Sequence, residues 1–180
     1  MSMPVLTHAQ ITQLSALVAQ YISEMHARYA AASQPLSQKQ KATMAGFFSE
    51  ELLDQSRLLV LANERVPNPD FYPNLAVMGF QNLPDLSRMD AITFSDVVVF
   101  HVPFSDGLLF HELVHVEQYR QLGIPRFADL YVQGFLTGGS YDQIPLERNA
   151  YHLGGEFEKD NTRRFQVADV VRTWIAEGRF

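Results

Sequence analysis

The sequence predicts an α+β fold that is mainly helical and contains one small antiparallel sheet. Capping signals precede several segments whose apolar residues recur at steps of three and four, which is typical of helices packed on a core. Residues 91–100 instead form two short β-branched and aromatic runs around a polar pair, which is typical of a β-hairpin. Because the 180 residues contain no repeat and no long linker, we expect a single domain over 1–180.

The N-terminal part, residues 1–56, is expected to be helical. Thr7 and Gln10 have the spacing of a capping box, and Ser37 with Gln40 repeats it. Each signal precedes a helix in this interpretation, and Ser49 precedes one further short helical turn. The predicted helical segments are residues 8–31, 37–46 and 49–54.

The middle part, residues 57–122, is expected to hold the sheet and one central helix. Three prolines within residues 67–73 predict a loop or broken turns. Ser105 caps the central helix, and Gly123 ends it. The predicted strands are residues 58–62, 91–94 and 97–100.

The C-terminal part, residues 123–180, is expected to be helical again. Pro125 and Pro145 each suit the first turn of a helix, and Gly138-Gly139 provides a flexible connection between the two. The predicted helices are residues 125–135, 145–159 and a last one that begins at Thr162.

Composition excludes several classes of function. The net charge of −6 disfavours a nucleic-acid partner, and no apolar run is long enough to span a membrane. The absence of cysteine excludes disulfides and thiolate metal sites, so a metal ion would need histidine and carboxylate ligands. No basic region precedes a compact apolar run near the N-terminus, and we therefore expect a cytoplasmic protein, with export by a route that needs no such signal left open.

The chemistry is concentrated in the five residues His111-Glu-Leu-Val-His115, an H-E-x-x-H motif inside the predicted central helix. Residues four apart lie on one helix face, so both imidazoles can reach one ion. Glu112 is rotated away from that line and can reach a metal-bound water as general base. Zinc is the metal that this motif favours, although iron and manganese also accept two histidines and a carboxylate.

This motif resembles that of the zincin metallopeptidases. The longer H-E-x-x-H-x-x-G-x-x-H pattern of the metzincin branch is absent, because Gln118 and Gln121 stand where its glycine and histidine would be. The layout Ile-Pro-Leu-Glu-Arg-Asn-Ala-Tyr over 144–151, after the motif, looks like small bacterial zincin-like proteins of the gluzincin type. The similarity covers about residues 91–158 and implies a zincin-like fold.

The resemblance implies a glutamate on a later helix as the third zinc ligand, and Glu147 is the best candidate. It lies in the first turn of the helix that Pro145 begins, 32 residues after His115. Four acidic residues and one histidine remain as alternatives: Glu117, Asp142, Glu156, Glu158 and His152.

Two further roles follow from the same resemblance. Zincins often use a tyrosine or histidine to stabilise the developing oxyanion. Tyr141 is the preferred candidate, and Tyr131, Tyr151 and His152 are the alternatives. Zincins also pair extended substrate with an edge strand beside the active-site helix, a role that residues 97–100 could fill besides packing in the core.

These observations predict a zinc-dependent metallopeptidase with a peptide or protein substrate. One zinc ion would be held by His111, His115 and Glu147, with Glu112 as general base. The alternative is a catalytically silent interaction domain that zinc stabilises by tying the central helix to the Glu147 helix.

Overall fold

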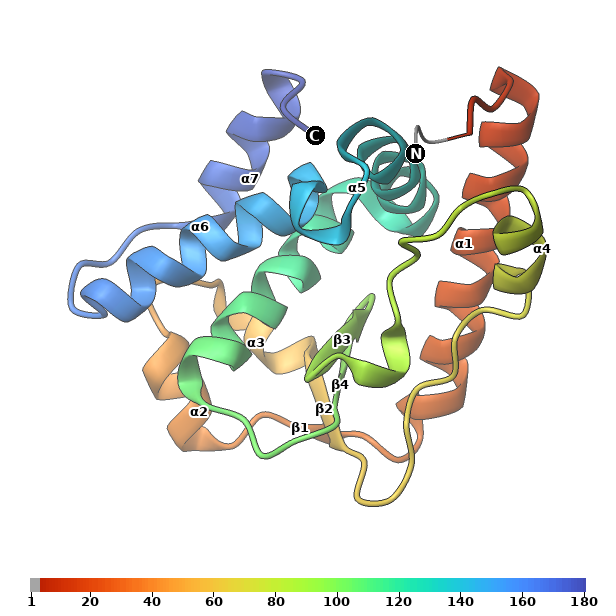
Figure 1. Cartoon of the computed structure of the whole chain (residues 1–180). Coiled ribbons are helices and arrows are strands. Elements are labelled where there is room, and N and C mark those ends of the chain that lie inside the picture. Colours follow the sequence, from red (N-terminus) through yellow and green to blue (C-terminus); the bar gives the residue numbers. More distant parts are fainter. Residues whose placement is uncertain (1–3) are drawn as a thin grey trace.

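The computed structural model describes residues 4–180, which fold into an α+β arrangement that is mainly helical (Figure 1). The α+β class expected from the sequence is thus confirmed. The helices are α1 (His8–Ala30), α2 (Gln38–Met44), α3 (Glu50–Gln55), α4 (Tyr72–Val77), α5 (Asp106–Gly138), α6 (Pro145–Lys159) and α7 (Val167–Ala176). Two 3₁₀ turns, η1 (Leu86–Arg88) and η2 (Tyr141–Gln143), accompany them.

The predicted helix starts of the N-terminal part are confirmed at atomic detail. The Thr7 hydroxyl accepts from the Gln10 backbone N–H, and the Gln10 side chain accepts from the Thr7 N–H. Ser37 and Gln40 form the same reciprocal pair at the start of α2. Local hydrogen bonding alone determines where these helices begin, which is why the sequence locates them well.

The sheet is mixed, not wholly antiparallel as expected. Its strands are β1 (Gln34–Pro35), β2 (Arg57–Val60), β3 (Ala91–Phe94) and β4 (Val97–Phe100), in the spatial order β1-β2-β4-β3. The hairpin of β3 and β4 is confirmed, with Ser95 at φ 60° in its tight turn. However, β2 runs parallel to β4, and only β1 and β3 pair antiparallel with their neighbours.

Strand β4 is an interior strand, so the expectation that residues 97–100 form the edge is wrong. It lies between β2 and β3, and all four of its residues are buried. Alternate side chains point to opposite faces. Val98 and Phe100 therefore belong to one apolar cluster, while Val97 and Val99 belong to another on the opposite face. The edge strand near the central helix is β3.

Helix α5 contains a break where the sequence predicts the end of one helix and the start of the next. Gly123 has φ 73° and ψ 161°, outside the helical region and in the range that favours glycine. Pro125 follows in the next helical segment, as expected. That segment continues past the predicted residue 135 to Gly138, and Gly139 ends it at φ 77°.

Two helices differ from the sequence-based expectation. Helix α4 begins at the end of the proline-rich segment, because Pro73 occupies its first turn, where the missing N–H costs nothing. Helix α7 begins at Val167 rather than Thr162. The Thr162 hydroxyl instead donates to the Asp160 carboxylate in a turn, so it caps no helix.

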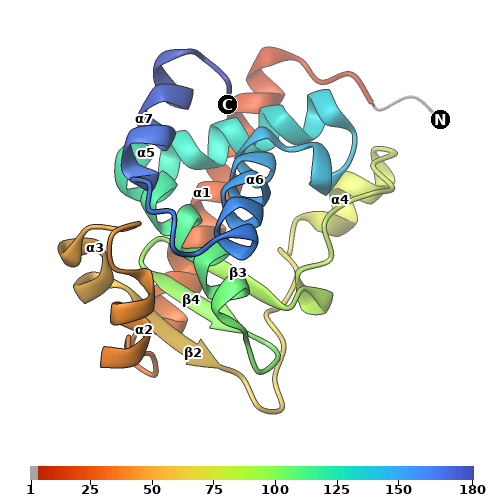
Figure 2. The ribbon, with the colours of Figure 1, turned by 90° about the vertical axis from the view of Figure 1, so that its left-hand side faces the viewer.

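The elements are arranged around α5, which crosses the sheet and contacts both α1 and α6 (Figures 1 and 2). Gly134 allows the start of α6 to approach α5 closely. A Cβ atom at this position would lie 2.6 Å from Cδ of Pro145. Within the part of the chain that the structure describes, no helix has the length and apolar character needed to cross a bilayer.

Candidate metal centre

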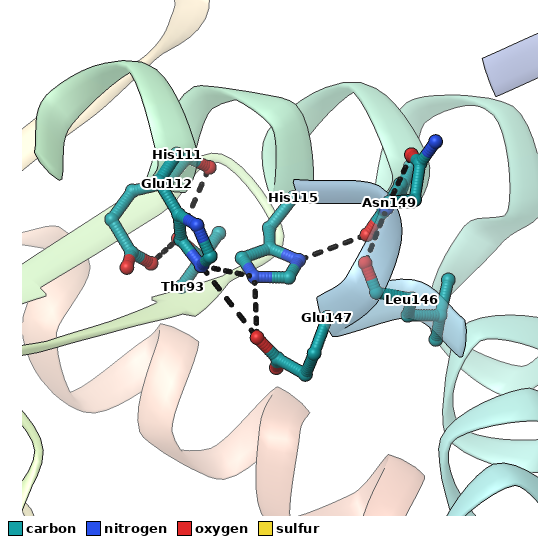
Figure 3. Close-up of polar contacts among 8 residues, drawn as sticks. Thr93, His111, Glu112, His115, Leu146, Glu147 and Asn149 are labelled. Atoms are coloured by element: carbon teal, nitrogen blue, oxygen red, sulfur yellow. Dashed lines mark hydrogen bonds and ion pairs between the residues drawn. The ribbon is translucent and has the colours of Figure 1, made fainter. Parts of the chain in front are cut away.

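His111 and His115 lie one turn apart on α5 and point to the same side of the helix (Figure 3). Their Nε2 atoms are 3.2 Å apart. Both side chains are buried, with 8% and 5% of the residue surface exposed. The spacing of the motif therefore produces the convergence of imidazoles that the sequence predicts.

Glu147, in the first turn of α6, completes the group from the opposite side (Figure 3). Its Oε2 lies 3.2 Å from Nε2 of His115 and 3.6 Å from Nε2 of His111. This oxygen is buried and has no hydrogen-bond partner among the described residues. A buried carboxylate oxygen that faces two imidazole nitrogens is well placed to bind a cation.

The three ligand atoms have the spacing that a small tetrahedral ion requires. Zinc bonds of about 2.0–2.1 Å place tetrahedral ligands about 3.3–3.4 Å from one another. The observed separations are 3.2, 3.2 and 3.6 Å. Among residues 4–180, His111, His115 and Glu147 thus form a buried group that could hold a metal ion.

Gln118 fixes the orientation and tautomer of His115. Its side chain is fully buried, and its amide nitrogen donates to the Leu146 carbonyl and to Oδ1 of Asn149, both 3.0 Å away. Its amide oxygen must therefore face Nδ1 of His115, at 2.8 Å. Since this oxygen can only accept, Nδ1 carries a proton, and Nε2 is the ring nitrogen left to bind a metal ion.

The charges in this group shift the pKa values of both partners. Burial lowers the pKa of His115, but the adjacent Glu147 carboxylate outweighs it and raises the pKa to about 9. For Glu147, burial raises the pKa, and the positive charges of His115 and His111 hold it well below its usual range. A proton on His115 thus compensates the carboxylate when no metal ion is bound.

Glu112 lies beside the group and is not part of it. Its carboxylate is buried, and Oε2 accepts a 2.7 Å hydrogen bond from the Thr93 hydroxyl on β3 (Figure 3). The packing of α5 on β3 makes this contact possible. Thr93 therefore holds the carboxylate in one orientation next to the candidate ligands.

Two hollows meet at this point. A cavity of about 100 Å³ and a groove of about 620 Å³ are both lined by Glu112 and Tyr141. His115 and Glu147 line the cavity, and His111 lines the groove. The candidate metal group thus borders space on two sides.

The structure brings Tyr141 close to the site. Burial first, and then the charge of Glu147, raise the pKa of its phenol well above the ordinary value, so the hydroxyl stays protonated. Tyr151 covers His111, with ring centroids 4.5 Å apart, and is 56% exposed. Tyr131 lines the cavity. The oxyanion role of Tyr141 stays a prediction.

The alternative third ligands lie elsewhere. The Glu117 carboxylate accepts from Gln121, and Asp142 accepts from the Ser140 hydroxyl. The remaining three, His152, Glu156 and Glu158, are outside the buried group that contains Glu147.

The residues that hold the site in place, Thr93, Gln118 and Asn149, were not expected from the sequence. Gln118 could have been found, because it lies three residues after His115 on the same helix face. Comparison of the chain with protein-family models, with curated proteins and with solved structures finds no match.

Proposed function

We propose that this chain is a zinc-dependent metallopeptidase, similar to the gluzincin-type zincins, that hydrolyses bonds in a peptide or protein substrate. One observation carries the proposal. His111, His115 and Glu147 converge at tetrahedral spacing, while Glu112 lies beside them at the junction of the cavity and the groove. A purely structural metal site has no need of a separate buried carboxylate in that position.

Zinc is the proposed metal, because two imidazoles and one carboxylate leave a fourth position open, as in catalytic zinc sites. When bound, zinc supplies a Lewis acid that polarises a carbonyl group and acidifies water. In this proposal, Glu112 accepts the proton of the attacking water and delivers it to the departing amine. The neutral phenol of Tyr141 donates a hydrogen bond to the developing negative charge.

The substrate backbone is proposed to run along β3, the edge strand beside α5. Among residues 4–180, β3 has a sheet neighbour on one side only, β4, and its Ala91 lines both the groove and the cavity. An extended peptide can add to such an edge by main-chain hydrogen bonds. This assignment replaces residues 97–100, which the sheet order places in the interior.

The decisive experiment is Glu112→Gln. The variant should bind zinc as the wild type does and lose cleavage of a quenched fluorogenic peptide library by at least about a hundredfold, since the proton acceptor is gone. Glu117→Gln is the matched control, because Glu117 lies on the same helix and contacts Gln121 instead of the site. Full activity of Glu112→Gln would overturn the proposal.

The silent, zinc-stabilised domain remains the second candidate, because the three ligand atoms join α5 to α6. An ion bound there would tie the two helices together. In that case the wild type would bind zinc and gain stability from it, but would cleave no member of the library.

A further inference from the structure

His101 is a buried histidine that the proposed reaction does not use. It follows β4 directly, 7% of its surface is exposed, and it lies outside the candidate metal group. Its Nε2 accepts a 2.9 Å hydrogen bond from the Val66 backbone N–H, and its Nδ1 lies 2.6 Å from the carbonyl oxygen of Met89. One imidazole therefore joins the end of β4 to two segments that lie 35 and 12 positions earlier in the chain.

These two contacts fix the protonation state of the ring. A backbone N–H can only donate, so Nε2 carries no proton, and a carbonyl oxygen can only accept, so Nδ1 must carry one. The ring is therefore neutral in this structure. A second proton would occupy Nε2 and meet the Val66 N–H, so that two donors would face each other without an acceptor.

No charged side chain pairs with His101 to compensate for a second proton. The ionisable residues next to the two contact points are all exposed: Glu64, Arg65, Arg88 and Asp90. Strand β4 itself contributes no charged residue. Within residues 4–180, no ion pair includes His101. Protonation would therefore leave the buried Val66 N–H without its acceptor and give no ion pair in return.

The contact with Val66 secures one part of the wall around the candidate site. Val66 lies in the loop 61–71 between β2 and α4, which Figure 1 draws in yellow. Of residues 62–66, as far as the structure describes them, the Val66 N–H makes the one hydrogen bond. Three of residues 69–72 then line the cavity, and Met89, on the other side of the imidazole, lines both the cavity and the groove. The imidazole thus fastens two pieces of this wall to each other.

We infer that His101 is an acid-sensitive latch that holds the loop 61–71 against the candidate site. In its neutral form the imidazole joins Val66 to Met89. Uptake of one proton from solvent at Nε2 breaks the hydrogen bond from Val66 and loosens the loop. Imidazole side chains ordinarily gain this proton between about pH 8 and about pH 5, so mild acid should open this side of the wall. The inference does not depend on the proposed function, because the latch contains no candidate ligand and no candidate base.

Hydrogen exchange of the full chain, measured by NMR, tests the latch. The exchange rate of the Val66 amide is compared with that of an unstructured chain at the same pH, and the ratio gives a protection factor. Between about pH 7.5 and about pH 4.5, this factor should fall at least tenfold more for Val66 than for Phe157, a buried residue on α6. A chelator at both pH values excludes a contribution from a change in metal occupancy.

Two variants provide the comparison. His101→Gln keeps an oxygen that can accept from Val66 and a nitrogen that can donate to Met89, but its amide gains no proton in this range. The protection of Val66 relative to Phe157 should then be the same at both pH values. His26→Gln removes a histidine that contacts Asp96 instead, and it should keep the wild-type fall.

Three results of the exchange experiment would overturn the latch. The first is a wild type in which the protection of Val66 does not fall in acid. The second is an equal fall in His101→Gln, and the third is loss of the fall in His26→Gln, which would assign the effect to another histidine.

A second measurement needs no variant and therefore stands even if His101→Gln does not fold. The NMR shifts of the ring nitrogens of His101 report which of them carry a proton. They should show one proton, on Nδ1, at about pH 7.5 and two at about pH 4.5, and the Val66 amide signal should move with the same midpoint. A ring that stays neutral, or a Val66 signal that moves with a different midpoint, would contradict the inference.

Discussion

Replacing Gln118 by leucine should weaken zinc binding, although Gln118 does not touch the ion in this account. The substitution keeps a buried side chain of similar length but removes the acceptor of His115 Nδ1 and the donor to Leu146 and Asn149. Loss of a hydrogen-bond partner behind a histidine ligand typically lowers metal affinity by about 10–100-fold, or about 1.4–2.8 kcal/mol.

The same substitution should also destabilise the metal-free protein. Each buried polar group left without a partner costs about 1–3 kcal/mol. With His115 Nδ1 and Asn149 Oδ1 both affected, we expect the free energy of unfolding to fall by about 2–6 kcal/mol. Chemical denaturation in the presence of a chelator measures this change.

Gln121→Leu is the control for Gln118→Leu. Gln121 lies three residues further along α5 and donates to Glu117 and to the Ala168 carbonyl, away from the candidate ligands. It should lose stability while its zinc affinity, measured by competition with a chromophoric chelator, stays within about twofold of the wild type. Gln118→Glu, which restores an acceptor for His115, should recover most of the affinity. Wild-type zinc affinity in folded Gln118→Leu would show that Gln118 does not support His115 as a ligand.

Three further predictions concern the candidate ligands and the residues around them. Thr93→Val should lower kcat by about tenfold at unchanged zinc content, because Glu112 loses its positioning hydrogen bond. Thr93→Ser, which keeps the hydroxyl, should retain the wild-type kcat. An unchanged kcat in Thr93→Val would show that Thr93 does not position Glu112. In metal-free protein the raised pKa of His115 stabilises the fold fully below pH 6.5, and this stabilisation is lost as the pH rises through about 9. The thermal midpoint of the wild type should therefore exceed that of Glu147→Gln most near pH 6 and least above pH 9. A difference in midpoint that does not change with pH would contradict this prediction. Gly134→Ala should cost about 1–3 kcal/mol of stability and weaken zinc binding, since its Cβ would lie 2.6 Å from Cδ of Pro145. Gly155→Ala on α6 is the control, because a Cβ atom there would have no described atom of another element within 4 Å.

Features determined by short stretches of chain could be predicted from the sequence. The caps at Thr7 and Ser37, the break at Gly123 and the convergence of His111 with His115 each depend on residues within four positions. Their geometry follows from helix periodicity and from glycine and capping chemistry, with no need for tertiary contacts.

Features that depend on packing between distant segments were missed. The parallel pairing of β2 with β4 joins residues 40 positions apart, such as Arg57 and Val97, and no local signal distinguishes it from an antiparallel pairing. The same reason hides Thr93, which contacts Glu112 only because β3 packs on α5. The position of Glu147 was expected from the resemblance and from Pro145, not from periodicity.

Zinc K-edge X-ray absorption of the wild-type protein and of Glu147→Ala would show directly whether His111, His115 and Glu147 hold one zinc ion. For the wild type, we expect one zinc ion per chain, coordinated by two imidazoles and two oxygen atoms, one of them from Glu147. Loss of the carboxylate in Glu147→Ala should change the oxygen coordination and release most of the zinc at micromolar concentration. An unaltered spectrum and zinc content in Glu147→Ala, or a wild type that binds no zinc, would contradict it.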